Sequence, residues 1–585
     1  MFRAVVSESR TFAKDADRLR GRDVLAALFA YGGLVIWLTW PLGESLGASL
    51  SLSQKACRFD SQLLGWALAH QSDALLFSPS TLLQGGAFHP ASNTILLGEA
   101  AFGALPLFLP VFALSGNPTL ALNLVFLLGA TATIASVHLV VRRLTGRHAA
   151  GVVAAATLLS SRWLLWQWAP CAPNYAMMFY LPWIFLLLAV GVSTRGRMFM
   201  LAFLMAMQGL VTVYLAVATF LVVGAVFLLR AFSASRRGEA FRLLGAMSLA
   251  ALPLILVFSS YLGTRMENPD LASQSVWRGV MQLSRLPWGP LDQRMPTGIA
   301  LSAAGLLGLG LLASAGGRGG AGARSSAEHA GVRQAVFWIV VGVLVSFSPI
   351  ARLEGGLIRL PHFWLGQWFG VYEVVREPHR LAVIALVGLS IGSGLAVSAI
   401  LHRIGAGAAL GWLVVALWVG VVGYETQAGL GPDRYGRPKV PLVRYPLLQP
   451  PAPDDELAGL LAEEAGPVLE LPVPLNRRGL IDPVAQVNAM YRSIYHRRPV
   501  VNGYNGYWPA GFAERMTDAQ ALPDLPALRR LQQSTGLTTI VVHLFKLNGP
   551  PRKKWVDASK VPQEFGMRLD QKLPGVLVFS VLPDL

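Results

Sequence analysis

The chain has 585 residues, of which 54% are hydrophobic and only 14% are charged. An ordinary soluble protein is about 45–50% apolar and about 25% charged, so this composition excludes a soluble single-domain enzyme, a disordered chain and a disulfide-rich scaffold. Lys and Arg number 49 against 32 Asp and Glu, which gives a net charge of +17. In so apolar a chain, this excess indicates cytoplasmic loops that retain Lys and Arg rather than a nucleic-acid partner.

Long apolar segments account for the composition. Residues 1–23 are polar and basic. The apolar stretches that follow them predict about 11 membrane spans, on the criterion that a span must cross roughly 30 Å of hydrocarbon. The predicted spans are Val24–Leu42, Pro118–Val141, Ala149–Ser160, Tyr175–Val192, Met198–Val213, Tyr214–Leu229, Phe241–Tyr261, Thr297–Ala315, Gln334–Ile350, Leu381–Leu401 and Ala408–Gly423. The sequence thus predicts a mostly α protein with a polytopic helical membrane domain over residues 24–425.

The basic connectors set the predicted orientation. Alternation from a cytoplasmic N-terminus places the clusters at Arg142–Arg147, Arg195–Arg197 and Arg230–Arg242 on the cytoplasmic side, as the positive-inside rule requires. Thr94–Leu114 is apolar enough to be a further span, but counting it would reverse this pattern. Because Gly and Pro interrupt it, we predict an interfacial or re-entrant segment within an outer loop of residues 43–117.

The composition changes near residue 426. Residues 426–453 form a linker rich in Pro, Gly and Arg, and the charge density beyond it is that of a soluble protein. Short strands are predicted at Gly466–Pro474, Thr538–Phe545 and Gly575–Leu582, with helices at Asp454–Glu464 and Ala527–Ser534. An odd number of spans places this α/β domain, residues 454–585, outside the cytoplasm. Cys57 and Cys171 also fall outside, which leaves a disulfide and two unpaired thiols as open alternatives.

Polar side chains gather in the predicted outer loop. Asp60 stands near the start of Phe59–His70, whose apolar residues predict an amphipathic helix at the membrane surface. Its carboxylate is either a helix N-cap or a group facing a lipid-linked substrate, and the two are compatible. His89, Asn93 and Glu99 are polar groups in an otherwise apolar stretch, and we take them as candidates for sugar or acceptor binding. A divalent metal held by Asp60, His89 and Glu99 is a further alternative, although their spacing matches no dedicated metal motif.

A later outer stretch, Trp163–Tyr175 (WLLWQWAPCAPNY), combines several aromatic rings with amides. It is typical of an interfacial aromatic belt, and a carbohydrate pocket is the alternative, because sugar rings stack on aromatic faces and bond to amides. Polar groups where the next two spans meet would line the same cavity. The candidates are Trp166, Gln167, Asn174, Gln208 and Tyr214.

Two outer loops carry arginine against the positive-inside trend. Arg265 lies in one, and Arg376 and Arg380 lie at the end of the next. Arginine suits a bidentate grip on phosphate, which makes these three residues candidate phosphate ligands. Ion pairing with neighbouring acids such as Glu377 is the alternative.

Several segments carry a family resemblance that extends over nearly the whole chain. They are Phe59–His70, Phe88–Glu99, Arg142–Arg147, QGLVTVYLAV from Gln208, REPHRLAV from Arg376, Arg497–Pro509 (RRPVVNGYNGYWP) and Val541–His543. With these segments the chain resembles the GT-C superfamily of polytopic glycosyltransferases, which use polyprenyl-phosphate sugars. It is most similar to bacterial members with a C-terminal soluble domain. The resemblance implies that Asp60 acts as a base or metal ligand, although Ser61 and Gln62 stand where several GT-C families have a second acid.

The resemblance implies an inverting glycosyltransferase of the bacterial cytoplasmic (inner) membrane. It would move a sugar from a polyprenyl-phosphate donor to a glycan or lipid acceptor of the envelope at the outer face, with Asp60 deprotonating the acceptor and Arg376 or Arg380 stabilising the lipid phosphate. Two alternatives stay open. One is a non-catalytic scaffold or lipid-carrier-binding protein of polysaccharide assembly, in which NGYNGYWP binds a glycan or partner. The other is a transporter or flippase, which the scarcity of ionisable residues in the spans disfavours.

Overall fold

The computed structural model describes residues 21–52, 59–161, 163–267, 326–347, 349–353, 356–368, 375, 378–403, 408–428, 445–452, 456–474 and 481–583. The chain folds into two compact units. Unit 1 comprises residues 1–44, 124–256 and 276–445, and unit 2 comprises residues 45–123, 257–275 and 446–585. Unit 2 therefore combines most of the predicted outer loop with the predicted C-terminal domain, although the two are far apart in the sequence.

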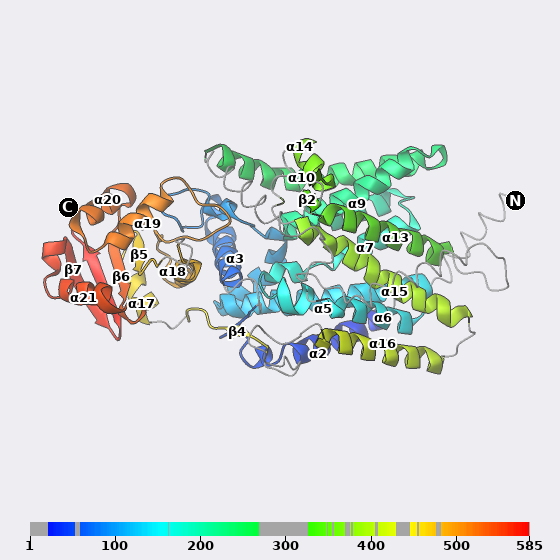
Figure 1. Ribbon diagram of the computed structural model, residues 1–585, viewed down its shortest axis with the longest axis horizontal. Helices are drawn as coiled ribbons and strands as arrows, with labels where there is room; N and C mark the ends of the chain where they lie inside the picture. The colour runs from blue at the N-terminus through cyan, green and yellow to red at the C-terminus, as the bar shows by residue number, and fades with distance from the viewer. Residues whose placement is uncertain are drawn as a thin grey trace. The chain divides into compact units, whose positions relative to one another are not determined.

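Unit 1 is built from long helices. They are α2 (Gly21–Leu38), most of α5 (Pro118–Thr145), α6 (His148–Ser160), α7 (Tyr180–Val190), α8 (Arg195–Val211), α9 (Val213–Ala231), most of α10 (Arg237–Glu267), α13 (Ser326–Ser346), α15 (Val383–Arg403) and α16 (Ala408–Ala428). α15 packs along both α13 and α6, and these helices run side by side in Figure 1. Apolar helices packed in this way make unit 1 a helical membrane bundle.

Each predicted span in the described part of the chain overlaps a helix, although several helices end a few residues before the predicted bounds. Seven helices among the described residues are long and apolar enough to cross a membrane, which makes the chain a multi-pass membrane protein. Thr297–Ala315 lies outside the described residues. α6 has only 13 residues, so it rises about 20 Å, well short of the roughly 30 Å of hydrocarbon. The total of about 11 spans stays a prediction.

Local chemistry explains where the long helix α5 ends. It has 28 residues and carries Arg142 and Arg143 in its last turn, where positive charge stabilises the helix dipole. Gly146 follows with a φ of +74°, the left-handed conformation that commonly terminates a helix. Arg142 also forms an ion pair with Asp23 of α2 at 2.9 Å, which holds the ends of two helices together.

Shorter elements connect the helices of unit 1. They are η5, a π-helical turn (Trp163–Gln167), η6 (Pro173–Ala176), η7 (Ala234–Arg236), the antiparallel strands β2 (Ile350–Leu353) and β3 (Gly356–Arg359), α14 (Pro361–Trp368) and η11 (Pro378–Ala382). α6 thus ends at Ser160, before the first tryptophan of the aromatic stretch. Cys171 in this stretch is buried and disulfide-bonded, and Cys57 lies outside the described residues.

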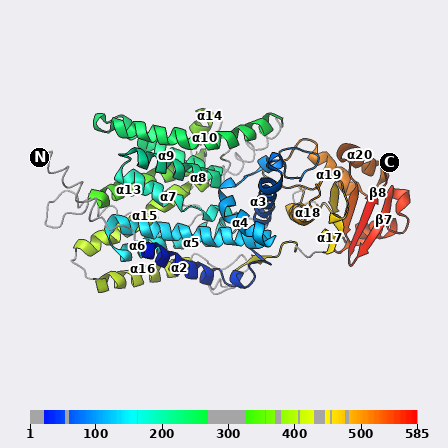
Figure 2. The same cartoon turned by 180° about the vertical axis from the view of Figure 1, so that it is seen from behind.

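The later residues of unit 2 form a four-stranded mixed sheet. Its strands are β5 (Val468–Leu471), β6 (Thr539–His543), β7 (Met567–Leu573) and β8 (Val576–Val581), in the order β5-β6-β8-β7. β5 and β6 are parallel, and the other pairs are antiparallel; Figure 2 shows β7 and β8 next to each other. The accompanying helices are α17 (Glu456–Ala462), α18 (Pro483–His496), α19 (Phe512–Ala521), α20 (Leu525–Thr535) and α21 (Gly549–Ala558), with the short turns η12 (Leu544–Lys546) and η13 (Pro562–Phe565). The three predicted strand segments coincide with β5, β6 and β8.

The outer-loop residues of unit 2 form short elements. They are β1 (Leu50–Ser51), α3 (Asp60–Phe77), η2 (Pro79–Thr81), η3 (Thr94–Leu97), η4 (Phe102–Ala104) and α4 (Leu105–Ser115). β1 pairs antiparallel with β4 (Leu447–Leu448). α4 has 11 residues and rises about 16 Å, about half of the hydrocarbon thickness, which supports the prediction that Thr94–Leu114 does not cross the membrane.

The prediction that α3 is an amphipathic surface helix is wrong. Buried residues lie all around it, and it packs against α4 and α18; Figures 1 and 2 both place α3 beside α18. Two polar residues of α3 find hydrogen-bond partners inside the protein. Gln62 donates to Asn488 at 3.1 Å, and Gln71 donates to the carbonyl of Ala100 at 2.7 Å. α3 is therefore a central helix of unit 2.

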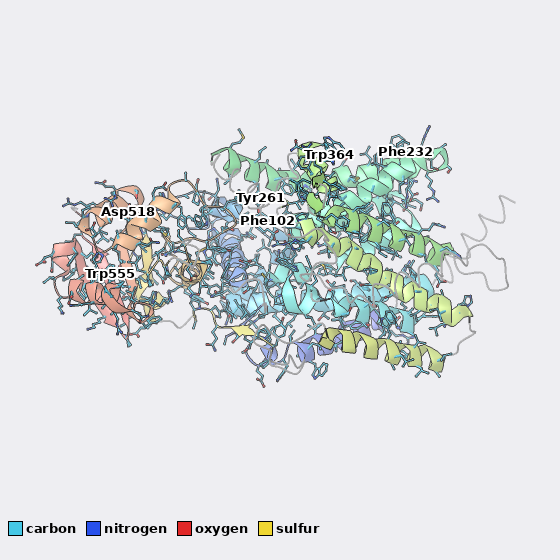
Figure 3. All side chains as sticks on the ribbon, viewed as in Figure 1. Phe102, Phe232, Tyr261, Trp364, Asp518 and Trp555 are labelled. Carbon is cyan, nitrogen blue, oxygen red and sulfur yellow. The ribbon has the colours of Figure 1, made fainter. Side chains whose placement is uncertain are left out.

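One hydrophobic core joins the segments of unit 2. Trp66, Phe88 and Leu97 of the outer loop are buried in the same cluster as Phe579 of the sheet. The end of α10 contributes Tyr261, whose hydroxyl accepts from the Ala100 N–H at 2.9 Å and donates to the Gly98 carbonyl at 2.6 Å. Figure 3 shows Tyr261 close to Phe102 of η4, and both pack on this core, while Trp555 of α21 lies at the sheet.

The NGYNGYWP segment lies within this core. Phe88 N–H donates to the Asn502 carbonyl at 3.0 Å, and Tyr507 N–H donates to the Leu97 carbonyl at 3.0 Å. A Cβ on Gly98 would overlap Asn505, and a Cβ on Gly503 would overlap the Phe88 ring, so glycine is required for these close approaches. The segment thus attaches the outer loop to the C-terminal sheet and helices. Its glycines and asparagines serve packing within unit 2.

Candidate functional site

The guanidinium of Arg380 lies among aromatic rings of unit 1. Arg380 belongs to η11, the turn that begins α15. Its Cζ lies 4.4 Å from the ring centre of Trp168 and 4.7 Å from that of Tyr214, and its Nη1 donates to the Tyr175 hydroxyl at 2.9 Å. We name Arg380, Trp168, Tyr175 and Tyr214 the arginine cage. Ring faces at these distances attract and hold a guanidinium.

Separate segments of unit 1 bring the three rings together. Trp168 follows the π-helical turn η5, Tyr175 lies in η6, and Tyr214 lies in the first turn of α9. α9 begins at this point because Thr212 caps it, with Oγ1 accepting from the Tyr214 N–H at 3.3 Å. The Thr212 hydroxyl also donates to the Tyr175 hydroxyl at 3.2 Å. The break between α8 and α9 therefore aligns two rings of the cage.

Two amides of unit 1, one of them next to Tyr175 in the sequence, are almost fully buried. Asn174 Nδ2 donates to the Val211 carbonyl at 2.9 Å, and Gln208 Nε2 donates to the Met177 carbonyl at 3.0 Å. The other amide atoms, Oδ1 of Asn174 and Oε1 of Gln208, have no hydrogen-bond partner among the described residues. A buried polar atom without a partner costs about 1–3 kcal/mol. A buried water or a hydroxyl of a ligand would satisfy these two oxygens.

Part of the sequence-based site comes together at the arginine cage. Arg380, Tyr214, Asn174 and Gln208 all contribute to this region of unit 1. Other candidates lie outside the described residues: the side chains of Trp166, Gln167 and Arg265, and the whole of Arg376.

Sequence reasoning missed two members of the cage. Trp168 and Tyr175 stand in the aromatic stretch, but a belt at the membrane interface and a cage around a cation have the same composition. The available signal was the Pro–Cys–Ala–Pro run between them, Pro170 to Pro173, which forbids a continuous helix and folds the stretch back on itself. Both rings are buried, with Tyr175 only 1% exposed, which a belt facing lipid would not require.

Asp60 belongs to unit 2 and is the first residue of α3. The N-cap is Phe59, and no side chain caps this helix end, so the prediction that Asp60 is the N-cap is wrong by one position. The local pattern does not resolve a helix start to better than one or two residues. A carboxylate in the first turn remains favourable, because the helix dipole is positive there.

The other outer-loop candidates also belong to unit 2. The ring of His89 contacts the backbone of Thr535, and burial lowers the pKa of His89 below its ordinary value. Asn93 adopts a left-handed backbone conformation with a φ of 53°, and Glu99 is half-buried. Among the described residues, no three His, Cys, Asp or Glu side chains lie close enough together to hold a metal ion. The alternative of a metal held by Asp60, His89 and Glu99 is therefore not supported.

A second group of buried charges lies at the sheet of unit 2. Glu470 of β5 accepts from Arg492 of α18, and its carboxylate lies 2.8 Å from Nε2 of His543 at the end of β6. The Glu470 side chain is only 4% exposed. Burial by itself would raise the pKa of Glu470, but the charge of Arg492 and the contact with His543 outweigh it and hold that pKa well below its ordinary value. Asn502 bonds to both backbone groups of Glu470, so this network fixes the start of the NGYNGYWP segment.

Comparison with known proteins identifies the fold. No family model and no curated protein sequence matches the chain. Among solved structures, the arabinofuranosyltransferase AftD from Mycobacteria superposes with a TM-score of 0.55 at 15% identity, over 97% of this chain and 42% of AftD. The chain has a GT-C-like fold. This finding confirms the fold that the sequence resemblance implied, in a chain that spans less than half the length of AftD.

Archaeal oligosaccharyltransferases are more distant neighbours of this GT-C-like fold. AglB from Archaeoglobus fulgidus, in complex with an inhibitory peptide and a dolichol-phosphate, gives a TM-score of 0.46 at 12% identity, over 89% of this chain and 69% of AglB. The oligosaccharyltransferase of the same organism tethered to an acceptor peptide gives 0.46 at 11% identity, over 90% of this chain and 70% of that one.

Proposed function

We propose that this GT-C-like chain is an inverting glycosyltransferase. It moves a sugar from a polyprenyl-phosphate donor to an envelope acceptor, a glycan or a lipid, at the outer face of the bacterial inner membrane. The observation that carries the proposal is the arginine cage, in which Arg380 supplies a cation suited to phosphate; Asn174 and Gln208, in neighbouring segments of unit 1, supply two amide oxygens suited to sugar hydroxyls. The GT-C-like fold supports the proposal only by analogy. Function belongs to sites and not to folds.

The cage is suited to a phosphate that gains charge as it leaves. Ring faces attract the guanidinium and hold its plane in place. A planar guanidinium donates two parallel hydrogen bonds to phosphate oxygens. Preorganised donors of this kind stabilise the developing charge of a leaving group, and removal of one costs about 10²–10³-fold in rate. In this proposal Arg380 stabilises the departing polyprenyl phosphate, while Asn174 and Gln208 accept from hydroxyls of the donor sugar.

The reaction needs a base for the acceptor, and the family resemblance assigns that role to Asp60. The acceptor hydroxyl gives its proton to the Asp60 carboxylate, and its oxygen forms a bond to the anomeric carbon. The bond from that carbon to the phosphate oxygen breaks on the opposite face, and the lipid phosphate leaves with the electron pair. General-base catalysis contributes about 10²–10⁴-fold to such a step.

Binding of polyprenyl phosphate to the purified full chain tests the phosphate role. Arg380→Lys keeps the charge but loses the planar fork, so we expect the affinity to fall about tenfold or more, as for a lost charge-assisted hydrogen bond. Arg359→Lys is the matched control, because Arg359 also stacks on rings, those of Phe363 and Trp364, but is exposed. Equal affinities for the two variants would show that Arg380 does not bind phosphate.

Transfer itself is measured separately. Asp60→Asn should abolish transfer to an envelope glycan while the chain still inserts into the membrane, and near wild-type transfer would remove Asp60 from the mechanism. The scaffold alternative cannot be tested by deleting the C-terminal residues, since their loss would open the shared core of unit 2. Movement of a labelled lipid-linked sugar across liposomes with no acceptor present would favour the flippase alternative instead.

A further inference from the structure

Unit 2 contains a cavity of about 390 Å³ that lies outside every group described so far. It is formed by the second half of α3, the turns from Ser78 to Gly86 and the end of α18. Sites for small molecules have volumes of about 300–1,000 Å³ and combine apolar walls with a few polar groups. Trp66 and Phe77 provide apolar wall, and Asp73 and Arg497 provide charge.

Asp73 and Arg497 face each other without closing a tight ion pair. Oδ2 of Asp73 lies 3.9 Å from Nη2 of Arg497, which is longer than a hydrogen bond. The side chains are 29% and 72% exposed, respectively. Each group therefore keeps hydrogen-bonding capacity toward a molecule in the cavity.

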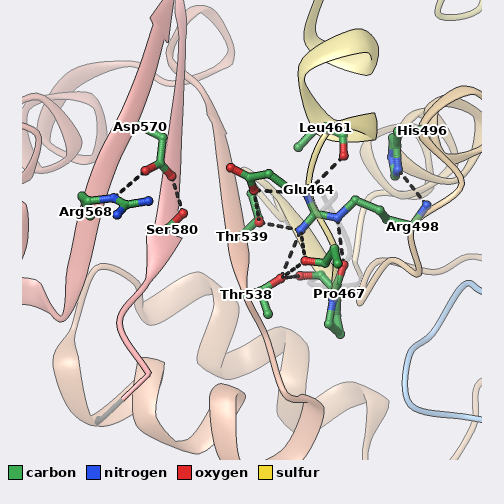
Figure 4. A network of polar contacts seen from close by, with 12 residues as sticks. Leu461, Glu464, Pro467, His496, Arg498, Thr538, Thr539, Arg568, Asp570 and Ser580 are labelled. Carbon is green, nitrogen blue, oxygen red and sulfur yellow. Dashed lines mark hydrogen bonds and ion pairs between the residues drawn. The ribbon is translucent and has the colours of Figure 1, made fainter.

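Two neighbouring polar residues of the cavity, His70 and Arg498, already form hydrogen bonds with other protein groups. His70 Nε2 lies 2.9 Å from the Thr81 carbonyl and 3.1 Å from the Gly85 N–H, so this ring atom serves the turn. Arg498 donates to the carbonyls of Gly466 and Ala465 at 2.9 and 3.0 Å and to threonine hydroxyls, as Figure 4 shows. The two adjacent arginines therefore have different roles. Arg498 forms hydrogen bonds at the sheet, and Arg497 lines the cavity.

The backbone conformation of Arg497 is a second observation that points to a functional role for its side chain. Arg497 has a φ of 58°, in the left-handed region, and ends α18 with its N–H bonded to the Ser493 carbonyl. Glycine is the usual residue at such a helix end, because a side chain is strained in this conformation. Strained residues cluster at functional sites, so an arginine in this conformation is a candidate functional residue.

We propose that this cavity binds a saccharide ring through two neighbouring hydroxyls. Asp73 accepts a hydrogen bond from one hydroxyl, and Arg497 donates to the oxygen of the next. A saccharide fits because its hydroxyls both donate and accept, whereas an anion would face Asp73 and a cation would face Arg497. The Phe77 ring, 72% exposed, offers an apolar surface for the C–H face of the sugar.

The saccharide is best understood as part of the acceptor glycan. This role rests on the proposed function, since a transferase must hold its acceptor as well as its donor. Binding of the saccharide to the cavity does not rest on it. If the chain binds sugars through Arg497 but transfers none, the cavity proposal stands and the proposed function fails. If the transfer rate and the acceptor KM do not change when Arg497 is lost, the proposed function stands and the acceptor role of the cavity fails.

Saturation-transfer NMR on the purified full chain in detergent tests the proposal. The probes are the methyl α-glycosides of glucose, mannose and galactose at millimolar concentration, and inorganic phosphate. We expect at least one glycoside to bind, its deoxy analogue lacking one of the two hydroxyls to bind more weakly, and phosphate to leave binding unchanged. Arg497→Gly should lower the affinity about tenfold or more, because a charge-assisted hydrogen bond is lost.

The same variant separates binding from folding. Arg497→Gly relieves the left-handed strain, so the unfolding temperature should stay the same or rise while binding is lost. Asp73→Asn should also weaken binding. The control is the exposed pair Asp518 and Arg530 of α19 and α20, 2.7 Å apart, whose variants Asp518→Asn and Arg530→Ala should bind like the wild type. The proposal is overturned if no glycoside binds, if both cavity variants bind normally, or if phosphate displaces the sugar.

Discussion

Arg492 of unit 2 and Arg380 of unit 1 are held in different ways, the first buried and the second half-buried. In unit 2, Arg492 meets the carboxylate of Glu470, which also contacts His543, so its charge is balanced inside the sheet network. In unit 1, Arg380 lies over the rings of Trp168 and Tyr214 and donates to the Tyr175 hydroxyl. Ring faces attract a guanidinium and hold it in place. Under the proposed function, Arg492 stabilises the fold and Arg380 binds the phosphate.

The largest effect is expected from removing the charge on Glu470. Glu470→Gln leaves Arg492 buried without its partner, and breaking a buried pair in this way costs about 3–5 kcal/mol. Chemical denaturation of the full chain would measure the loss in the free energy of unfolding. Glu463→Gln, at an exposed acid near α17, is the matched control and should change it by less than about 0.5 kcal/mol. A loss below that of the control would show that the pair is not needed for stability.

The corresponding change in the arginine cage should affect function more than folding. Arg380→Met keeps an apolar side chain against the rings, so the free energy of unfolding should fall less than in Arg492→Met, while the rate of transfer falls by about 10²–10³-fold. Arg492→Met should do the opposite, because it leaves Glu470 buried without its cation. Measuring unfolding and transfer for both variants checks the contrast, and a large stability loss in Arg380→Met would break it.

The contact between the outer loop and the C-terminal part of unit 2 gives a smaller effect. Gly98→Ala would force a Cβ onto the Asn505 side chain, and overpacking of this kind costs about 1–3 kcal/mol. Gly459→Ala is the control, because nothing lies near its Cβ position in α17 and alanine favours a helix. Hydrogen exchange should report the loss in unit 2 while the helices of unit 1 stay protected. Equal protection in both variants would mean that the loop is not held as described.

The smallest effect is a dependence of stability on pH in unit 2. The pKa of Glu470 is lower in the folded chain than in the unfolded chain, so the unfolded state takes up a proton first as the pH falls. Stability is therefore fully present above the ordinary glutamate pKa of about 4.3 and is lost below it, by up to about 1.4 kcal/mol per pH unit. Glu470→Gln should lack this component. Acid denaturation curves that are identical for the wild type and Glu470→Gln would contradict the assignment.

The helices of unit 1 could be predicted from sequence because lipid demands long apolar segments, which hydropathy detects directly. The same reasoning predicts that Gln208 and Tyr214 meet at the break between two spans, since polar groups at such a break turn inward. Arg380 stands out because arginine is unexpected in an outer loop. These signals are local, and each depends on one stretch of chain.

Other features depend on contacts that no local pattern contains. Trp168 and Tyr175 form part of the arginine cage only because α9 and η11 approach them from elsewhere in the chain. The polar residues of α3 suggest a surface helix, yet Gln62 and Gln71 find partners inside unit 2. Arg497 gives no signal in the sequence, because its strained backbone and its approach to Asp73 exist only after α18 has packed against α3.

The discontinuous make-up of unit 2 has a consequence for biogenesis. Phe88 and Leu97 pack against residues beyond 446, and Leu50 pairs with Leu448, so the earlier segment must wait until all of residues 124–445 have been synthesised and inserted. At about 5–20 residues per second, this delay lasts on the order of tens of seconds. During that interval the apolar surface of the first segment has no native partner. Its assembly is therefore delayed until residues beyond 446 have been made, and the apolar surface of the first segment stays exposed to aggregation for that time.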